Sequence, residues 1–460
     1  MNQNPLGAEK IGKLLRAYAI PSVISMLVGA LYNIVDQFFI GHSVGMLGNA
    51  ATNVAFPLST LCTAAALLFG VGGAANFSLH LGAKREKDAA RSVGNASSML
   101  IVIGIIISAV VLLFLNPLMR LFGATAEVLD YALTYTKITA FGFPFLILTT
   151  GGSALIRADG SPRYSMICTL TGAILNTILD PLFIFVFHMD MAGAALATVI
   201  GQVVSAILVI AYFFRFKSIR LQKRDFLLHA KDCARITSLG TSHCFNQIAM
   251  MVVQIVMNNT MTHYGALSVY GSEIPLACSG IIAKVTMIFF SFIIGISQGL
   301  QPIVGYNYGA KRYDRVRKTL RLSLGFGTGI AVFFSACFHL FPRQIIGLFG
   351  SGSEEYFAFA ERYFHIFLLF LFLDAIQPIA SNFFTSIGKA AKGILLSLTR
   401  QVIFLLPLLI VLPIFFGIDG VMYAGPASDF VAAVLAGILV VKEFRLMRKQ
   451  EQNEIQTAEN

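Results

Sequence analysis

The sequence predicts an all-α polytopic membrane protein in which twelve transmembrane helices form two parallel-repeat six-helix lobes. Three observations predict this fold: the composition, the number of long apolar runs, and a repeat at a constant offset. Of the 460 residues, 56% are hydrophobic and only 12% are charged, and the mean hydropathy is +0.75. Such a composition lies outside the range of soluble globular domains and is typical of proteins that cross a membrane many times.

Apolar runs of about twenty residues, the length that a helix needs to cross a bilayer, recur along the chain. Only helices and closed barrels satisfy their backbone hydrogen bonds in lipid, and runs of this length indicate helices. We predict twelve spans, near residues 17–40, 52–78, 93–115, 133–156, 164–187, 193–214, 236–262, 276–306, 322–342, 363–386, 393–416 and 420–441.

Lysine and arginine are distributed unevenly between the two sides of these spans. Twenty-nine fall in the termini and loops of one side and four on the other, with Lys284 left inside a span. Because positively charged loops stay in the cytoplasm, the number of spans is predicted to be even and both termini cytoplasmic. The same loops account for the net charge of +11, so we expect no nucleic-acid partner.

The longest basic loop divides the chain into two halves of similar length. We predict an N-terminal lobe of spans 1–6 at residues 1–214, a cytoplasmic linker at 215–235, a C-terminal lobe of spans 7–12 at 236–445, and a polar cytoplasmic tail at 446–460. A shift of 227 residues aligns Gly82-Ala83-Lys84-Arg85 with Gly309-Ala310-Lys311-Arg312, and Gly72 with Gly299. Six spans separate the copies, so the repeats are parallel, as in many transporters. A duplicated bundle without transport is the alternative.

A buried acid interrupts the apolar stretch Leu170–Phe187, which contains Asn176 and Asp180. A carboxylate inside a span costs about 2.5–3.5 kcal/mol and usually marks an ion or proton site. The two residues are four apart and share one helix face. Pro181 lacks an N–H and leaves the carbonyl of Thr177 without its helical partner. The Asp180 carboxylate, the Asn176 amide oxygen and the Thr177 carbonyl are ligands that suit a hard cation. Burial would also raise the pKa of an aspartate and so permit proton exchange. The structural alternative is that these groups only form hydrogen bonds between helices.

Several motifs resemble the MATE (multidrug and toxic compound extrusion) family of transporters. The resemblance covers roughly residues 10–445 and is carried by Ala19-Ile20-Pro21-Ser22, Tyr32-Asn33-Ile34-Val35-Asp36, the two Gly-Ala-Lys-Arg loops, Gly295-Ile296-Ser297-Gln298-Gly299-Leu300-Gln301-Pro302 and Arg157-Ala158-Asp159-Gly160-Ser161-Pro162. The chain is most similar to a bacterial branch of the family.

This resemblance implies a secondary active multidrug efflux transporter in a prokaryotic cell (inner) membrane. Such a protein exchanges amphipathic, mostly cationic compounds for inward-moving Na⁺ or H⁺ by alternating access. We therefore expect small-molecule amphipathic substrates, contact with the lipid bilayer, a monomer, and no cofactor apart from the coupling ion. The sequence has no His-Glu metal motif and no phosphate-binding glycine loop, and we expect no enzyme activity.

The resemblance also implies which residues couple the ion. Positions of the family's cation site are occupied here by Asp36, Asn176, Asp180 and Thr198, and Tyr135 is expected to add a hydrogen-bond donor. In the family the first helix bends as the site changes occupancy. Pro21 removes a helical hydrogen bond from that span and is the candidate for this conformational change.

The second lobe departs from the family pattern. Asp374 matches an acidic position of some branches, but the seventh span has no acid, and Pro407 stands opposite Asp180 at the repeat offset. We therefore predict that the cation site is confined to the first lobe. Lys284 lies within the eighth span and should need an anion or water, and we predict that it pairs with Asp374.

Three polar residues on the spans are candidates for the substrate cavity, although hydrogen bonding between helices explains them equally well: Gln202, Gln254 and Asn258. The alternative function is a lipid-linked oligosaccharide flippase of the same superfamily. Such a cavity would need several lysines and arginines for pyrophosphate. Only Lys284 lies mid-span, which favours efflux.

Overall fold

The computed structural model describes residues 4–349 and 353–459, and this part of the chain is helical and contains no strand. The predicted termini at residues 1–3 and 460 lie outside the described residues. The helices are α1 (Pro5–Ala8), α2 (Ile11–Ser43), α3 (Met46–Gly82), α4 (Glu86–Leu113), α5 (Leu115–Leu121), α6 (Ala126–Ala158), α7 (Pro162–Pro181), η1 (Leu182–Val186), α8 (Asp190–Phe213), η2 (Lys223–Phe226), α9 (Ala230–Ala266), α10 (Glu273–Gly309), α11 (Tyr313–Leu340), α12 (Pro342–Phe349), α13 (Glu354–Phe367), η3 (Leu371–Leu373), α14 (Ile376–Ser386), α15 (Ala390–Leu398), η4 (Thr399–Leu405), α16 (Leu406–Phe416) and α17 (Ile418–Glu459).

Helices of transmembrane length cover all twelve predicted spans. Among the described residues, ten are long and apolar enough to cross a membrane by length and composition, and an eleventh is the pair α13 and η3–α14, bent by 41°. The remaining predicted span lies in α9, a continuous helix of 37 residues that is not in this group. Polar residues spread along α9, such as Gln254, Asn258 and Asn259, lower its mean hydropathy and explain the difference.

The sequence repeat is also a repeat of backbone structure. Helices α3 and α10 each have 37 residues, α4 and α11 each have 28, and the bounds of each pair differ by 227. In the loop between them, Lys84 and Lys311 both adopt the left-handed conformation, with φ of 60° and 59°. Residues other than glycine rarely adopt this conformation, so the two loops are the same unusual turn.

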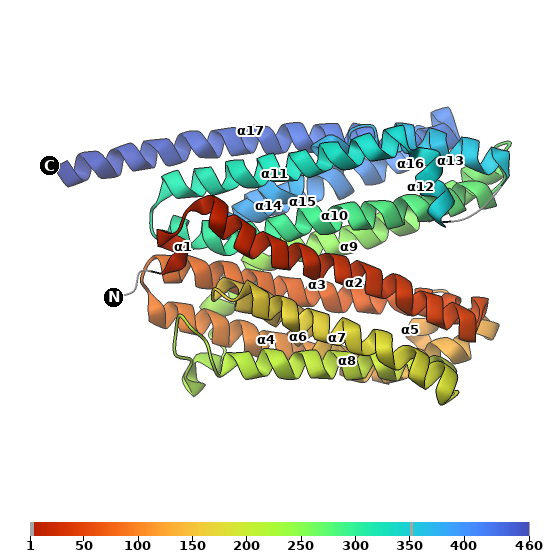
Figure 1. Ribbon diagram of the computed structural model, residues 1–460, viewed down its shortest axis with the longest axis horizontal. Helices are drawn as coiled ribbons and strands as arrows, with labels where there is room; N and C mark the ends of the chain where they lie inside the picture. The colour runs from red at the N-terminus through yellow and green to blue at the C-terminus, as the bar shows by residue number, and fades with distance from the viewer. Residues whose placement is uncertain (1–3, 350–352, 460) are drawn as a thin grey trace.

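The helices gather into two lobes, each around its own apolar core (Figure 1). In this view α3 to α8 form the lower lobe, most of α9 to α17 form the upper lobe, and α2 lies between them. The residues of α2 are divided between the cores, because Leu15 and Tyr18 are buried in the C-terminal cluster and Ile40 in the N-terminal one. Helix α1 and the C-terminal end of α17 lie at the same end of the bundle, as an even number of spans requires.

The lobes meet by direct backbone contact near the two Gly-Ala-Lys-Arg loops. We call this part of the molecule, which also carries both termini, the basic end. A Cβ atom on Gly82 would lie 2.0 Å from the Tyr306 carbonyl oxygen, and one on Gly309 would lie 2.1 Å from the Leu79 carbonyl oxygen. Only glycine permits such close approach of two helices.

The same contact continues along α9. A Cβ on Gly240 would lie 1.7 Å from the Leu68 carbonyl oxygen, and one on Gly72 would lie 2.1 Å from that of Ile236. We call these four glycines, Gly72, Gly82, Gly240 and Gly309, the glycine seam. The seam closes the space between the lobes at the basic end.

The segment between the lobes is fastened to the N-terminal one. The Asp159 carboxylate accepts hydrogen bonds from the Tyr212 hydroxyl at 2.8 Å and from the backbone N–H groups of Lys217 and Ser218 at 2.7 and 2.9 Å. Burial raises the pKa of the Asp159 carboxyl above its usual range, and these donors oppose the rise. Asn95 accepts from the backbone N–H of His229 at 2.7 Å.

Two helix bounds differ from the predicted domain limits. Helix α9 begins at Ala230, inside the predicted linker, and α17 continues through the predicted polar tail as far as Glu459. Each helix therefore extends beyond the apolar run that predicted it. The Arg317–Glu451 ion pair, 2.7 Å long, holds the extended end of α17 against α11.

Candidate functional site

Three helices of the N-terminal lobe bring the predicted coupling residues together: α2 carries Asp36, α7 carries Asn176 and Asp180, and α8 carries Thr198. Glycines make this approach possible. A Cβ on Gly172 of α7 would lie 2.3 Å from the Ser205 hydroxyl of α8. The absence of a side chain here lets α7 and α8 pack closely enough for their polar groups to meet.

Hydrogen bonds confirm that the α7 and α8 residues form one cluster. The Asn176 side-chain N–H donates to the Asp180 carboxylate at 3.3 Å and to the Thr198 hydroxyl at 3.2 Å. The Asp36 carboxyl group of α2 lies beside that of Asp180. Asp180 is fully buried, and Asp36 is 8% exposed. We call Asp36, Asn176, Asp180 and Thr198 the acidic cluster.

Three oxygens of the acidic cluster have no hydrogen-bond partner although they are buried: Asp36 Oδ1, Asn176 Oδ1 and Asp180 Oδ2. No lysine or arginine interacts with the two carboxyl groups in the described part of the chain. Two adjacent carboxylates cannot both remain ionised in such surroundings without compensation. The cluster therefore needs a proton or a cation, and its free oxygens are ligands that a hard cation such as Na⁺ prefers.

Two tyrosines complete the surroundings of the cluster. The side chains of Tyr135, on α6, and Tyr32, on α2, both lie near Thr198 and the two carboxyl groups. Tyr135 was expected from the family resemblance, whereas Tyr32 is an additional residue of the site. The spacing of Tyr32 four residues before Asp36 places both on one helix face and could have indicated it.

Pro21 is buried on α2, where that helix passes α7. The Pro21 carbonyl accepts a hydrogen bond from the Ser25 hydroxyl at 2.9 Å, and Ser25 in turn accepts one from Thr169 of α7 at 3.1 Å. The end of α7 is irregular as well, because Pro181 is followed by one turn of π-helix, η1. Such π-turns frequently occur at functional sites.

The predicted pairing of Asp374 with Lys284 is wrong. Arg400 donates to the Asp374 carboxylate at 3.1 Å and to that of Asp429 at 2.6 Å, while Lys284 is exposed and forms no ion pair in the described part of the chain. Arg400 was counted with the loop residues, but it lies inside the π-helix η4 and is 14% exposed. A basic residue a few positions beyond a Lys-rich loop gives no signal that it turns inward.

The other polar candidates are Gln254 and Asn258 on α9 and Gln202 on α8, four residues after Thr198. On α9 the Gln254 side chain donates to that of Asn258 at 2.9 Å, and both are half-buried. The Gln202 side-chain oxygen is buried without a partner beside Gly142, where α6 and α8 pack.

The two lobes thus hold acidic pairs of different character. Asp374 and Asp429 share a resident guanidinium, whereas Asp36 and Asp180 share none. Two repeated six-helix lobes, closed together at one end and carrying an uncompensated acidic pair, define a multi-pass membrane transporter.

The chain belongs to the MATE family, because the family model MatE matches residues 21–182 and 243–411. The multidrug export protein MepA of Staphylococcus haemolyticus is 28% identical over 441 residues, covering 94% of both chains. MepA of Staphylococcus aureus is 26% identical over 437 residues and covers 93% of both.

The fold is that of solved MATE structures. An outward-facing multidrug resistance MATE family transporter of the MOP superfamily superposes with a TM-score of 0.90 at 22% identity, covering 98% of this chain and 99% of the other. The predicted fold class and family resemblance are therefore confirmed.

Proposed function

We propose that this protein is a secondary active multidrug efflux transporter that exchanges amphipathic, mostly cationic compounds for inward-moving Na⁺ or H⁺ by alternating access. The observation that carries this proposal is the acidic cluster. There Asp36 and Asp180 are buried beside each other, and neither forms an ion pair with a lysine or arginine in the described part of the chain. The names of the staphylococcal relatives, multidrug export proteins, support the substrate class.

The geometry suggests how such a site couples ion movement to the lobes. Asp36 lies near one end of α2, while the other end of the same helix is buried in the C-terminal core through Leu15 and Tyr18. When a proton or Na⁺ leaves, Asp36 and Asp180 repel each other, and the repulsion acts on the contact between α2 and α7. Movement of α2 would then reach both lobes.

The closed basic end agrees with one state of an alternating-access cycle. The glycine seam holds the lobes together there, and the next state of the cycle requires the seam to part. By the distribution of lysine and arginine, we propose that this end and both termini face the cytoplasm of a prokaryotic cell.

The test is efflux of a cationic dye from proteoliposomes under a Na⁺ gradient or a pH gradient, each imposed separately. We expect one gradient to drive efflux and Asp36→Asn and Asp180→Asn each to abolish the gradient-driven part. Asp130→Asn, an exposed acid in the same lobe, is the matched control and should transport normally. Dye efflux that needs neither gradient, or full activity in both cluster variants, would refute the proposal.

A further inference from the structure

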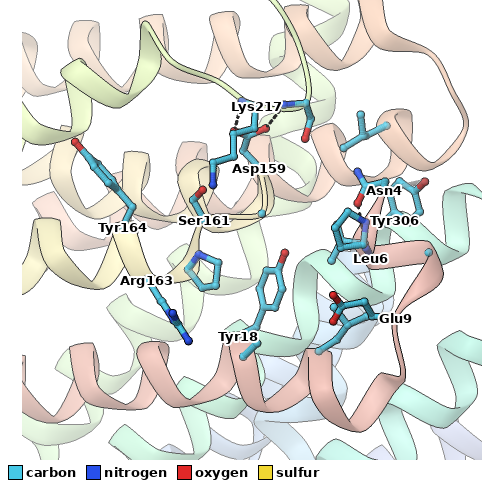
Figure 2. Close-up of a pocket in the computed structure, with 18 of the residues that line it drawn as sticks. Asn4, Leu6, Glu9, Tyr18, Asp159, Ser161, Arg163, Tyr164, Lys217 and Tyr306 are labelled. Carbon is cyan, nitrogen blue, oxygen red and sulfur yellow. Dashed lines mark hydrogen bonds between the residues drawn. The ribbon is translucent and has the colours of Figure 1, made fainter. Parts of the chain in front are cut away.

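A polar cavity lies at the basic end of the molecule, and its lining includes no residue of the acidic cluster. Its volume is about 1650 Å³. In Figure 2, Ser161, Arg163 and Tyr164 lie on one side and Asn4, Leu6, Glu9 and Tyr306 on the other, with Tyr18 between them. We call it the basic-end cavity. It exceeds the about 300–1,000 Å³ of typical small-molecule pockets.

The two sides of this cavity belong to different lobes. Residues 4–9 are held on the C-terminal lobe, because Arg315 donates to the carbonyls of Leu6 at 3.1 Å and Glu9 at 2.7 Å, and Arg312 donates to that of Gly7 at 2.6 Å. The opposite side is the loop before α7 together with Lys217, all in the N-terminal lobe. Whatever fills the cavity touches both lobes at once.

The charge of the cavity favours an anion. Four cationic side chains line it, and none forms an ion pair in the part of the chain that the structure describes: Lys84, Arg163, Lys217 and Arg312. Arg312 retains donors beyond the one that it gives to Gly7.

The acids of the cavity are largely compensated. Glu9 pairs with Lys13 at 3.2 Å, and both oxygens of Asp159 already accept hydrogen bonds. Glu86 is the third acid of the lining. Glu86 is thus the one acid of the lining for which no compensating contact has been described, against four cationic side chains. This balance of charge attracts an anionic ligand and disfavours a cationic one.

Apart from Asn4, Ser161 and Ser218, the remaining lining is apolar or aromatic. Leu14, Tyr18 and Ile167 lie where α2 and α7 enter their transmembrane stretches, and Ile167 is 49% exposed. A ligand that carries its negative charge at one end and hydrocarbon at the other matches this division. Basic pockets between helices at the cytoplasmic side of membrane proteins commonly take lipid headgroups.

We propose that the basic-end cavity binds one anionic phospholipid of the cytoplasmic leaflet, with its phosphate near Lys217 and Arg163 and its acyl chains along Leu14 and Ile167. Because its walls come from both lobes, the bound lipid bridges them in the state described here.

The chain contains no tryptophan, so a single introduced tryptophan reports on its own surroundings. We would place it at Ile167→Trp and reconstitute the protein with brominated phosphatidylglycerol or brominated phosphatidylcholine, both of which quench tryptophan on contact. Ile105→Trp, 56% exposed on α4, reports general lipid contact. The measured quantity is the binding constant of the anionic lipid relative to the zwitterionic one.

At position 167 we expect the anionic lipid to bind about fivefold or more tightly than the zwitterionic lipid. At position 105 we expect the two lipids to bind about equally well. Adding Lys217→Gln and Arg163→Gln should bring position 167 to parity. Adding Lys223→Gln and Arg224→Gln, an equal charge loss on exposed residues outside the cavity, should leave the preference unchanged.

Parity at position 167 in the parent protein, or equal loss with both charge pairs, would overturn the proposal. Two further arms separate other occupants. Relief of quenching by millimolar inorganic phosphate would assign the site to a free anion, and stronger displacement by a cationic dye than by unlabelled phosphatidylglycerol would assign it to substrate. Either result would overturn binding of a lipid, and resistance to both supports it.

Discussion

We expect Arg400→Met to lower the free energy of unfolding by about 3–5 kcal/mol, the usual cost of removing one partner from a buried charge cluster. Asp374 and Asp429 are 5% and 4% exposed, and Arg400 contacts both. Methionine keeps much of the apolar stem but removes the guanidinium, which lies over the Phe290 ring at 5.3 Å from its centroid, and so leaves two carboxylates without a counter-charge. For a lobe of this size the loss corresponds to about 10 °C in Tm.

The assay is thermal unfolding of the purified protein in detergent, followed by size-exclusion fluorescence. Arg362→Met is the control, because the Arg362–Asp419 pair is short, at 2.7 Å, but 45% and 28% exposed, and exposed pairs contribute less than about 1 kcal/mol. The triple variant Arg400→Met, Asp374→Asn, Asp429→Asn should regain most of the stability. An Arg400→Met protein that melts within about 2 °C of the parent would refute the reasoning.

Three further predictions concern other contacts. Gly172→Ala should lower Tm and weaken gradient-driven efflux by pushing α7 from α8, whereas Gly325→Ala, with nothing within 4 Å of its added methyl, should not; equal melting points would contradict this. Arg315→Gln should speed hydrogen exchange in residues 4–9 without changing exchange in the rest of α11, and unchanged protection would count against the fastening described above. Lys284→Met should leave Tm unchanged and should not rescue Asp374→Asn, since the two do not touch; a rescue would show that they pair in another state.

The sequence predicts the scaffold well because the physical signals are long and repeated. Apolar runs fix the spans within several residues, and the 227-residue offset that aligns Gly82 with Gly309 also relates the bounds of whole helices. In the site, the spacing of Asn176 and Asp180 requires only helical geometry. Their meeting with Asp36 on another helix followed from the family resemblance and not from any local pattern.

The parts that sequence analysis missed depend on where a charged side chain points. Arg400 follows Lys389 and Lys392 at the start of α15, and a residue there satisfies the positive-inside rule whether it faces water or turns into the lobe. The π-helix η4 directs it inward, and no residue pattern in that stretch predicts a π-turn. In helix α9 the sequence signal was too strong rather than absent. Its apolar residues predicted a span, although the polar residues among them keep the helix out of the group that is apolar enough to cross a membrane.

The glycine seam has the arrangement of an isologous dimer contact. Gly82 touches Tyr306, and its repeat equivalent Gly309 touches Leu79, the equivalent of Tyr306, so each helix presents the same surface to the other. A contact of this kind is what two copies of one six-helix unit form about a twofold axis. At the basic end, the Gly82 and Gly309 part of the seam therefore retains the self-complementary surface expected of an ancestral half-length protein that paired with itself before its gene was duplicated and fused.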